Sequence, residues 1–420
     1  MYLHSDVNAF YCSVEQVFRP DLAGEPVIVA TNNDGAIAAL NRAAKALGLK
    51  RGQPLFEVLP LIHRHKVHLF SSNYTLYAEF SSRFHSIVGE NIPRSETYSI
   101  DEIFGSLAGF SPPFDYETFG RELRQKVYQQ TALTCGIGIA PTKTLAKAAT
   151  AAAKKYTKTQ GVVVLEDPHR RDRLLALMDV SDVWGIGNRL AARLNAVGIK
   201  TALELAKADI RFIRRLMGVV VERTVRELRG EPCFALDDNP PSRQQIVVSR
   251  SFGERLTRME DMQQAICAFS CRAGEKLRRN RAYASSITVF MQSSRHLRHM
   301  PYFSALRTIP LPATQDSREL VCAARQALQL IWKPGIQYAK AGVMLGDLGD
   351  GREQLDLFCH HTPGKNSQAL MQLMDALNQK QRGTLFLAGE GIQRRYKMKQ
   401  QWLSPCYTTQ WKDLPVAWLK

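Results

Sequence analysis

Two adjacent carboxylates, Asp101 and Glu102, lie in the stretch ETYSIDEIFGSL, residues 96–107, which otherwise has the pattern of a half-buried extended segment. Repulsion between the like charges and the loss of their hydration both oppose such an arrangement, so a positive partner must compensate them. A third carboxylate, Asp6, ends the apolar stretch at the start of the chain. Chemistry at these residues therefore depends on what brings positive charge to them.

The charge of the whole chain indicates a polyanionic partner. The net charge is +17 and the isoelectric point is about 9.6, whereas the apolar fraction of 45% and the charged fraction of 23% are ordinary for a globular protein. Nucleic acid is the leading partner. An anionic membrane surface is the second choice, but no basic amphipathic anchor or lipidation signal supports it.

The length of 420 residues predicts about three or four domains. No apolar run reaches membrane-spanning length, and charge interrupts the first residues too early for a signal peptide. The eight cysteines lack paired spacing. We therefore expect a reduced, cytoplasmic protein without zinc.

Strands and helices alternate in the first third of the chain, which predicts an α/β or α+β region with a central sheet. This sheet is the element that must position the carboxylates. Besides the carboxylate stretch, the predicted strands are 1–6, 26–30, 67–70 and 133–140, and the predicted helices are 8–18, 41–49, 73–88, 116–130 and 141–156.

The remaining two thirds of the chain change character twice. Residues 170–230 read as short helices with Gly-containing turns, and residues 231–245 have the composition of an interdomain linker. A βαββαβ unit follows, and the last seventy residues look weakly organised. The predicted strands of this unit are 246–252, 282–292, 300–309 and 336–345, and its helices are 259–280 and 316–332.

The stretch HSDVNAFY, residues 4–11, resembles the first metal-binding motif of the Y-family, or translesion, DNA polymerases, and SIDE, residues 99–102, resembles the second. The segments FRPDL, NNDG, FSSNYTLY and SPCYTT bring the chain closer to the UmuC-like catalytic subunit of bacterial DNA polymerase V, and the resemblance covers nearly the whole chain.

The resemblance implies an α+β multidomain fold, a right-hand polymerase with a ferredoxin-like palm, small fingers, a helical thumb and a βαββαβ little finger. The implied boundaries are 1–19 and 76–168 for the palm, 20–75 for the fingers, 169–230 for the thumb, 231–245 for the linker, 246–347 for the little finger and 348–420 for a C-terminal tail.

The chemistry of such a polymerase accounts for the carboxylates. Two Mg²⁺ ions roughly 3.5–4 Å apart activate the primer hydroxyl and stabilise the pyrophosphate leaving group, and Mg²⁺ prefers oxygen ligands. By resemblance, Asp6 and Asp101 bridge both ions, Glu102 holds the primer-side ion, and the Val7 carbonyl completes the nucleotide-side shell. A solvated turn remains an alternative for Glu102 alone.

Sugar selection is implied for Tyr11, whose ring would lie under the sugar of the incoming deoxyribonucleotide and exclude a 2′-OH. Phe10 is expected beside it at the nucleotide site, although the alternative of a purely structural role in the core fits Phe10 better than Tyr11. Small residues at Ala36 and Ala38 would leave room for a distorted template base.

Binding of the triphosphate requires cations, and aligning NRAAKALG with the family places Arg42 and Lys45 on the helix after the second strand. Lys154 would join them from the Ala-rich helix. Arg42 replaces the usual Tyr and Lys45 the usual Arg, which costs bidentate geometry at Lys45. Solvated helix charges are the alternative interpretation.

Two regions are predicted to contact DNA. Residues 183–199 form a helix–hairpin–helix, in which Gly185 and Gly187 permit a tight turn whose N–H groups face phosphate; an ordinary αα-hairpin is the alternative. In the little finger, basic side chains are predicted to line duplex phosphates, although a solvated face is the default for any charge run. These residues are Arg250, Lys276, Arg278, Arg279 and Arg281.

The tail contains QLDLF, residues 354–358, which resembles peptides that dock into the bacterial sliding clamp, with Gln354, Leu355, Leu357 and Phe358 at the interface. A last edge strand is the rival interpretation. The UmuC-like resemblance further implies a processed UmuD-like dimer and a RecA filament as partners.

We therefore predict an error-prone, template-directed DNA polymerase that performs translesion synthesis in the SOS response, with two Mg²⁺ ions and dNTP substrates. One alternative is a non-catalytic scaffold that binds DNA and the clamp, for which the carboxylate cluster has no use. Another is a different two-metal phosphotransferase, for which Tyr11 and the little finger have no role.

Overall fold

The computed structural model describes residues 1–31, 35–110, 114–237, 243–294, 301–350, 366–380, 383–392, 396, 399–414 and 416. Its contacts divide the chain into two units, Met1–Pro240 with Gln400–Lys420, and Pro241–Lys399. The division at residue 240 falls inside the segment predicted as a linker.

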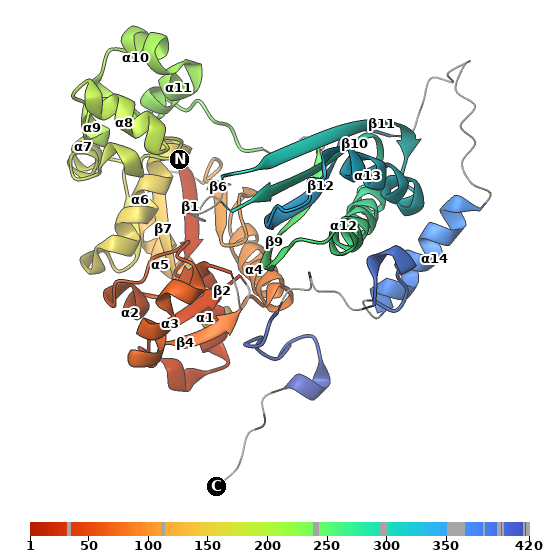
Figure 1. Ribbon diagram of the computed structural model, residues 1–420. Coiled ribbons are helices and arrows are strands. Elements are labelled where there is room, and N and C mark those ends of the chain that lie inside the picture. Colours follow the sequence, from red (N-terminus) through yellow and green to blue (C-terminus); the bar gives the residue numbers. More distant parts are fainter. Residues whose placement is uncertain are drawn as a thin grey trace. The chain divides into compact units, whose positions relative to one another are not determined.

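The central sheet of the first unit is built around β1 (Tyr2–Val7) (Figure 1). β1 pairs antiparallel with β6 (Glu102–Ser106) on one side and with β7 (Cys135–Ala140) on the other. β5 (Arg94–Thr97) and β8 (Val162–Val164) complete the order β5-β6-β1-β7-β8. A residue at the end of β1 therefore has strands on both sides.

The two faces of this sheet are covered by different helices. Leu3 and Val7 belong to an apolar core shared with α1 (Phe10–Val17), α4 (Tyr74–Gly89) and α5 (Tyr116–Thr131). On the opposite face, His4 Nδ1 lies 2.9 Å from Thr150 Oγ1 of α6 (Lys143–Lys155). Because side chains alternate along a strand, Asp6 lies on the same face as His4.

A small second sheet has the order β3-β2-β4. β2 (Val27–Ala30) pairs antiparallel with β3 (Ile37–Leu40) and parallel with β4 (His68–Ser71). α2 (Arg42–Ala46) and α3 (Leu55–Arg64) share an apolar core with this sheet, and the 3₁₀ turn η1 (Pro20–Leu22) precedes it.

The region predicted to be helical contains helices and no strand from residue 165 to residue 237, all of which are described. These elements share an apolar core with α6. The 3₁₀ turn η2 (Thr157–Thr159) lies before β8, and the elements after it are α7 (Pro168–Ala176), η3 (Val180–Asp182), α8 (Asn188–Ala196), α9 (Ala202–Lys207), α10 (Ile210–Met217) and α11 (Val219–Leu228).

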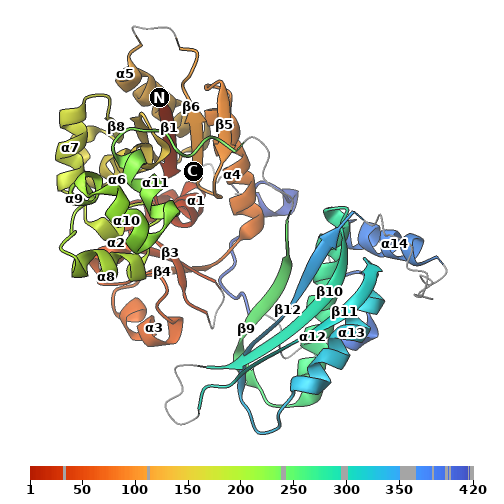
Figure 2. The ribbon, with the colours of Figure 1, turned by 90° about the horizontal axis from the view of Figure 1, so that it is seen from above.

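The second unit has the predicted βαββαβ order and an antiparallel sheet, β11-β10-β12-β9, against which α12 and α13 pack side by side (Figure 2). Together with the first unit, it confirms the mixed α+β class. Its elements are β9 (Ile246–Leu256), α12 (Met259–Arg279), β10 (Tyr283–Ser293), β11 (Ser304–Thr314), α13 (Ser317–Ile331) and β12 (Tyr338–Gly349).

The expectation of a weakly organised tail is wrong for the described residues after 365. Residues 367–380 form α14, which packs in the second unit, where Met371 and Met374 are buried. Residues 400–414 pack in the first unit, where Ser71 N donates a 2.8 Å hydrogen bond to Trp402 O at the edge of β4. The 3₁₀ turns η4 (Ala388–Glu390) and η5 (Trp411–Asp413) complete the tail. Polar composition concealed these contacts, because few residues of each segment are buried.

Candidate active site

The three carboxylates predicted from the sequence lie together at one end of the central sheet. Asp6 is the Cα partner of Glu102 in the β1–β6 pairing, and Val7 N donates a 3.0 Å hydrogen bond to Asp101 O. The stretch expected to be extended is divided into two strands by a turn at residues 98–101. This turn places Asp101 beside the end of β1.

Two lysines of α6 supply the positive charge that the carboxylates require. Lys154 Nζ lies 2.5 Å from Asp6 Oδ1 and 3.2 Å from Val7 O, and Lys147 Nζ lies 2.9 Å from Glu102 Oε1. Lys154 was predicted to bind triphosphate, whereas Lys147 was not predicted at all. Its signal was the spacing of seven residues, which places both lysines on one face of a helix.

Close packing of α6 against β7 brings the lysines within reach. A Cβ atom at Gly138 would lie 2.1 Å from Ala146 O and 2.4 Å from Thr150 N, so only glycine permits this approach. The strand sequence CGIGIA thus serves the site, although its glycines lie on β7 and the carboxylates on β1 and β6.

Burial and charge shift the protonation of the neighbouring groups. Burial raises the pKa of the Asp6 carboxyl to about 6; Lys154 opposes this rise, and Asp101 and Glu102 add to it. Burial lowers the pKa of His4 well below its ordinary value, and the nearby lysines lower it further. His4 Nε2 lies 3.8 Å from Glu102 Oε1, so a neutral imidazole lies beside that carboxylate.

The oxygen atoms at this end of the sheet suit a hard divalent cation. Asp6 Oδ1 and Val7 O both contact the same ammonium group, so both point toward one cation position. Asp101 Oδ1 accepts a 2.7 Å hydrogen bond from Ser99 Oγ. Within the described residues, no three His, Cys, Asp or Glu side chains already converge on a single point. The lysines hold Asp6 and Glu102 separately instead.

Tyr11 lies at the start of α1, close after Asp6. Its ring stacks on that of Tyr77 with centroids 4.3 Å apart and an interplanar angle of 15°, and the ring of Tyr74 meets it edge-on at 6.1 Å. Phe10, expected among the nucleotide-binding residues, is only 3% exposed and belongs to the core, as the alternative interpretation had it. The Tyr11 ring is thus fixed on one side by its contacts with the rings of Tyr77 and Tyr74.

The predicted nucleotide contacts in the small sheet are exposed or half-buried. Ala36 precedes β3, Ala38 lies within it, and Arg42 and Lys45 are exposed residues of α2, whose first turn is capped by Asn41. Sequence reasoning missed a further cation. The positive charge of Arg51, in the turn after α2, acts on the Tyr11 hydroxyl and opposes the rise in its pKa that burial causes.

Comparison with known proteins assigns the chain to a family. Residues 5–151 match the model of the impB/mucB/samB family, and residues 243–357 match the model of its C-terminal domain. The chain is 50% identical to protein MucB of Salmonella typhimurium over the full length of both, and 49% identical to protein UmuC of the same species, strain LT2, over 99% of each. The chain belongs to the impB/mucB/samB family.

Solved structures show a similar fold. A Dbh–Dpo4–Dbh chimera described as a Y-family DNA polymerase matches with a TM-score of 0.66 and 20% identity, covering 83% of this chain and 98% of that chain. The predictions of a Y-family polymerase fold and of a UmuC-like, error-prone translesion DNA polymerase are therefore confirmed, and the scaffold alternative is not favoured. Residues 368–417 match a domain of unknown function, DUF4113.

Residues 183–199, predicted to form a helix–hairpin–helix that contacts DNA, contain one helix, α8, and are attached to the turn at residues 98–101. Gly185 has a φ of 89°, and Gly187 caps α8. Trp184, which directly precedes Gly185, donates a 3.1 Å hydrogen bond through Nε1 to the Tyr98 hydroxyl. Lys147 Nζ lies 4.5 Å from the centroid of the Tyr98 ring, so one lysine contacts both Glu102 and this aromatic cluster.

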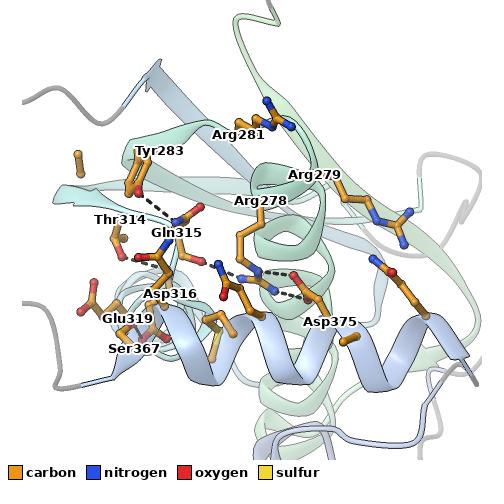
Figure 3. A pocket seen from close by; sticks show the side chains of 16 residues that line it. Arg278, Arg279, Arg281, Tyr283, Thr314, Gln315, Asp316, Glu319, Ser367 and Asp375 are labelled. Carbon is orange, nitrogen blue, oxygen red and sulfur yellow. Dashed lines mark hydrogen bonds and ion pairs between the residues drawn. The ribbon is translucent and has the colours of Figure 1, made fainter.

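One predicted DNA contact in the second unit is contradicted. The Arg278 side chain is only 8% exposed, and its guanidinium donates to both carboxylate oxygens of Asp375, to Gln315 O and to Ser317 Oγ (Figure 3). It lies beside a pocket of about 700 Å³ between α14 and the βαββαβ unit. Because its guanidinium is bonded to Asp375, Gln315 and Ser317 within the second unit, Arg278 is placed to stabilise α14 rather than to line duplex phosphates.

The other predicted basic residues remain accessible to different extents. Arg279 is 54% exposed and pairs with Glu275, Arg281 is exposed after the end of α12, and Arg250 and Lys276 are half-buried. The predicted clamp residues Gln354, Leu355, Leu357 and Phe358 lie outside the described residues. No helix of the described residues is both long enough and apolar enough to cross a bilayer.

Proposed function

We propose that this chain adds deoxyribonucleotides to a primer opposite damaged template bases by two-metal nucleotidyl transfer at the Asp6, Asp101 and Glu102 carboxylates. The observation that carries the proposal is the convergence of Asp6 Oδ1 and Val7 O on one ammonium, with Asp101 and Glu102 adjacent. When bound, two Mg²⁺ ions would activate the primer hydroxyl and stabilise charge on the leaving pyrophosphate.

The residues of α6 have a second part in this proposal. Lys154 holds Asp6 and Val7 O through a single flexible ammonium, which incoming cations can replace. Released from these partners, it would contact the triphosphate together with Arg42 and Lys45. Arg51 joins this set because its charge already acts at Tyr11. Lys147 stays at Glu102 and keeps that side chain oriented.

Tyr11 is proposed to select the sugar. Its ring is held from behind by Tyr77, so it cannot retreat into the core when a ribose 2′-OH approaches. Ala36 and Ala38 would border the nascent base pair and leave space for a distorted template base. Phe10 contributes by anchoring the start of α1 in the core.

Primer–template DNA is the proposed macromolecular substrate. The net charge of +17 supports it, and the N–H groups at Gly185 and Gly187 would meet phosphate without regard to sequence. The accessible basic residues of the second unit would add phosphate contacts. We further propose that the protein acts in the cytoplasm during the SOS response, with a processed UmuD-like dimer and a RecA filament as partners.

The sliding clamp is proposed to bind QLDLF. Replacing Leu357 and Phe358 by alanine should weaken clamp binding in a pull-down or surface plasmon resonance assay, because these side chains would fill the apolar pocket of the clamp. Nucleotide addition on a short template without clamp should be unchanged. Full clamp affinity in the double variant would place the docking site elsewhere in the chain.

Primer extension tests the proposed activity. The purified full-length chain is given Mg²⁺, dNTPs and a template that is either intact or carries an abasic site, with and without the UmuD-like and RecA partners. We expect insertion opposite the lesion that depends on Mg²⁺. Absence of extension on both templates under all of these conditions would refute the proposal.

A further inference from the structure

A buried carboxylate in α1 has no part in the proposed chemistry. Glu15 is 1% exposed, and burial raises the pKa of its carboxyl. Its Oε1 accepts a 2.6 Å hydrogen bond from the Tyr77 hydroxyl and a 3.1 Å hydrogen bond from Ser404 Oγ. Burying a carboxyl group costs free energy unless donors form hydrogen bonds to it, so these two hydroxyl groups stabilise Glu15 in the interior.

Tyr77 connects this carboxylate to the proposed sugar-selecting ring. It is fully buried, its hydroxyl is fixed by Glu15, and its ring stacks on Tyr11 at 4.3 Å. The stack is nearly parallel, at 15°. A shift of the Tyr77 ring therefore changes the surface against which Tyr11 rests.

The other donor to Glu15 comes from a segment far away in the sequence. Ser404 is 331 residues after Asn73, whose side-chain Nδ2 donates to both Ser404 O and Ser404 Oγ at 3.1 Å. Asn73 also caps the first turn of α4, the helix that carries Tyr77. The segment and the Tyr77 ring are thus fixed to the same helix.

Further contacts hold this C-terminal segment in place. Leu403 forms a parallel bridge with Ser71 at the edge of β4. The Tyr407 ring stacks on Phe18, just after α1, at 4.3 Å and 14°. Backbone pairing on one side of Ser404 and ring stacking on the other determine where its hydroxyl points.

We propose that the C-terminal segment, residues 400–414, positions Tyr11 through the connected side chains of Ser404, Glu15 and Tyr77 and thereby contributes to discrimination between deoxyribonucleotides and ribonucleotides. Ser404, Glu15 and Tyr77 are positioning residues, since all three are buried and act through the Tyr11 ring. The inference rests on the proposed role of Tyr11. The inference assigns a positioning role in the first unit to part of the DUF4113 region, residues 368–417.

Steady-state incorporation of one dNTP and the matching rNTP by the full-length protein tests this inference. Tyr11→Ala should produce the largest loss of discrimination. Ser404→Ala and Tyr77→Phe should each lower the ratio of kcat/KM values for dNTP over rNTP by about three- to tenfold, the range for one net hydrogen bond. Thr409→Ala removes an exposed hydroxyl from the same segment and should leave the ratio unchanged.

The ratio separates positioning from a general structural defect, because loss of folded protein lowers both kcat/KM values equally. If Tyr11→Ala relaxes sugar selection but Ser404→Ala and Tyr77→Phe keep the wild-type ratio, the inference is overturned and the proposed role of Tyr11 stands. If Tyr11→Ala also keeps the wild-type ratio, the role of Tyr11 fails and the inference fails with it.

Discussion

Two carboxylate–cation contacts, one in each unit, show how the same charges serve different purposes. Asp6 and Lys154 meet through one nitrogen and one oxygen, and their side chains are 22% and 27% exposed. Asp375 and Arg278 meet through two hydrogen bonds of 2.7 and 2.8 Å, and Arg278 is 8% exposed.

The difference lies in how readily each contact is replaced. A lysine ammonium lies on a flexible side chain, so another cation can replace it at the carboxylate. Breaking a buried, bidentate guanidinium–carboxylate pair leaves an unpaired charge in the interior, which is costly. The Arg278 donors are also occupied by Gln315 O and Ser317 Oγ. The first contact therefore suits a site that takes up cations, and the second suits a permanent joint between α12 and α14.

The largest effect is expected for Asp101→Asn. Nucleotide addition should fall by at least ~10³-fold in single-turnover primer extension, because an amide is a weak ligand for Mg²⁺ at the position where charge must be stabilised. Binding of primer–template, measured by fluorescence anisotropy, should persist. The free energy of unfolding should not fall, since the substitution relieves repulsion among carboxylates. Normal extension by this variant would remove Asp101 from the metal site.

Asp375→Asn should show the opposite pattern. The free energy of unfolding should fall by about 2–3 kcal/mol, because a buried guanidinium loses its charged partner, while nucleotide addition per folded molecule stays near that of the wild type. Chemical denaturation measures the first quantity and primer extension the second. Glu260→Gln, which breaks an exposed pair with Arg258, is the matched control and should change stability little. Equal stabilities of Asp375→Asn and Glu260→Gln would contradict the structural role.

The comparison also explains which features were predictable from the sequence. The carboxylates stood out because two like charges interrupt an apolar strand pattern, and the alternating elements predicted the sheet that brings them together. Arg278 was assigned to DNA because it lies in the basic run EKLRRNR, beside residues that are exposed. Its partner Asp375 is 97 residues later, in a segment without strong periodicity.

Long-range polar contacts were the features that the sequence did not reveal. Asn73 and Ser404 are ordinary polar residues, and only folding brings them within 3.1 Å of each other. Lys147 was detectable in principle from its spacing to Lys154. Its contact with Glu102 depends on the approach of α6 to Gly138, which no local pattern encodes.

Lys147→Met sharpens the comparison inside the active site. Nucleotide addition should fall by about tenfold, because Glu102 loses the ammonium at 2.9 Å that orients it and offsets its charge. Sugar discrimination should be unchanged, since Lys147 does not contact Tyr77 or Tyr11 among the described residues. Lys158→Met, at an exposed lysine in the turn after α6, is the control. An equal loss of activity in both variants would show that total charge matters rather than this contact.

The smallest effect is expected at the neighbour of Arg278. Arg279 is 54% exposed and pairs only with Glu275 among the interactions of the described residues, so Arg279→Ala should change the free energy of unfolding by less than ~0.5 kcal/mol. If its guanidinium reaches a phosphate, the slope of log affinity for DNA against log salt should decrease by about one. Titrations at several salt concentrations measure this slope. A slope equal to that of the wild type would show that Arg279, like Arg278, does not contact duplex phosphates.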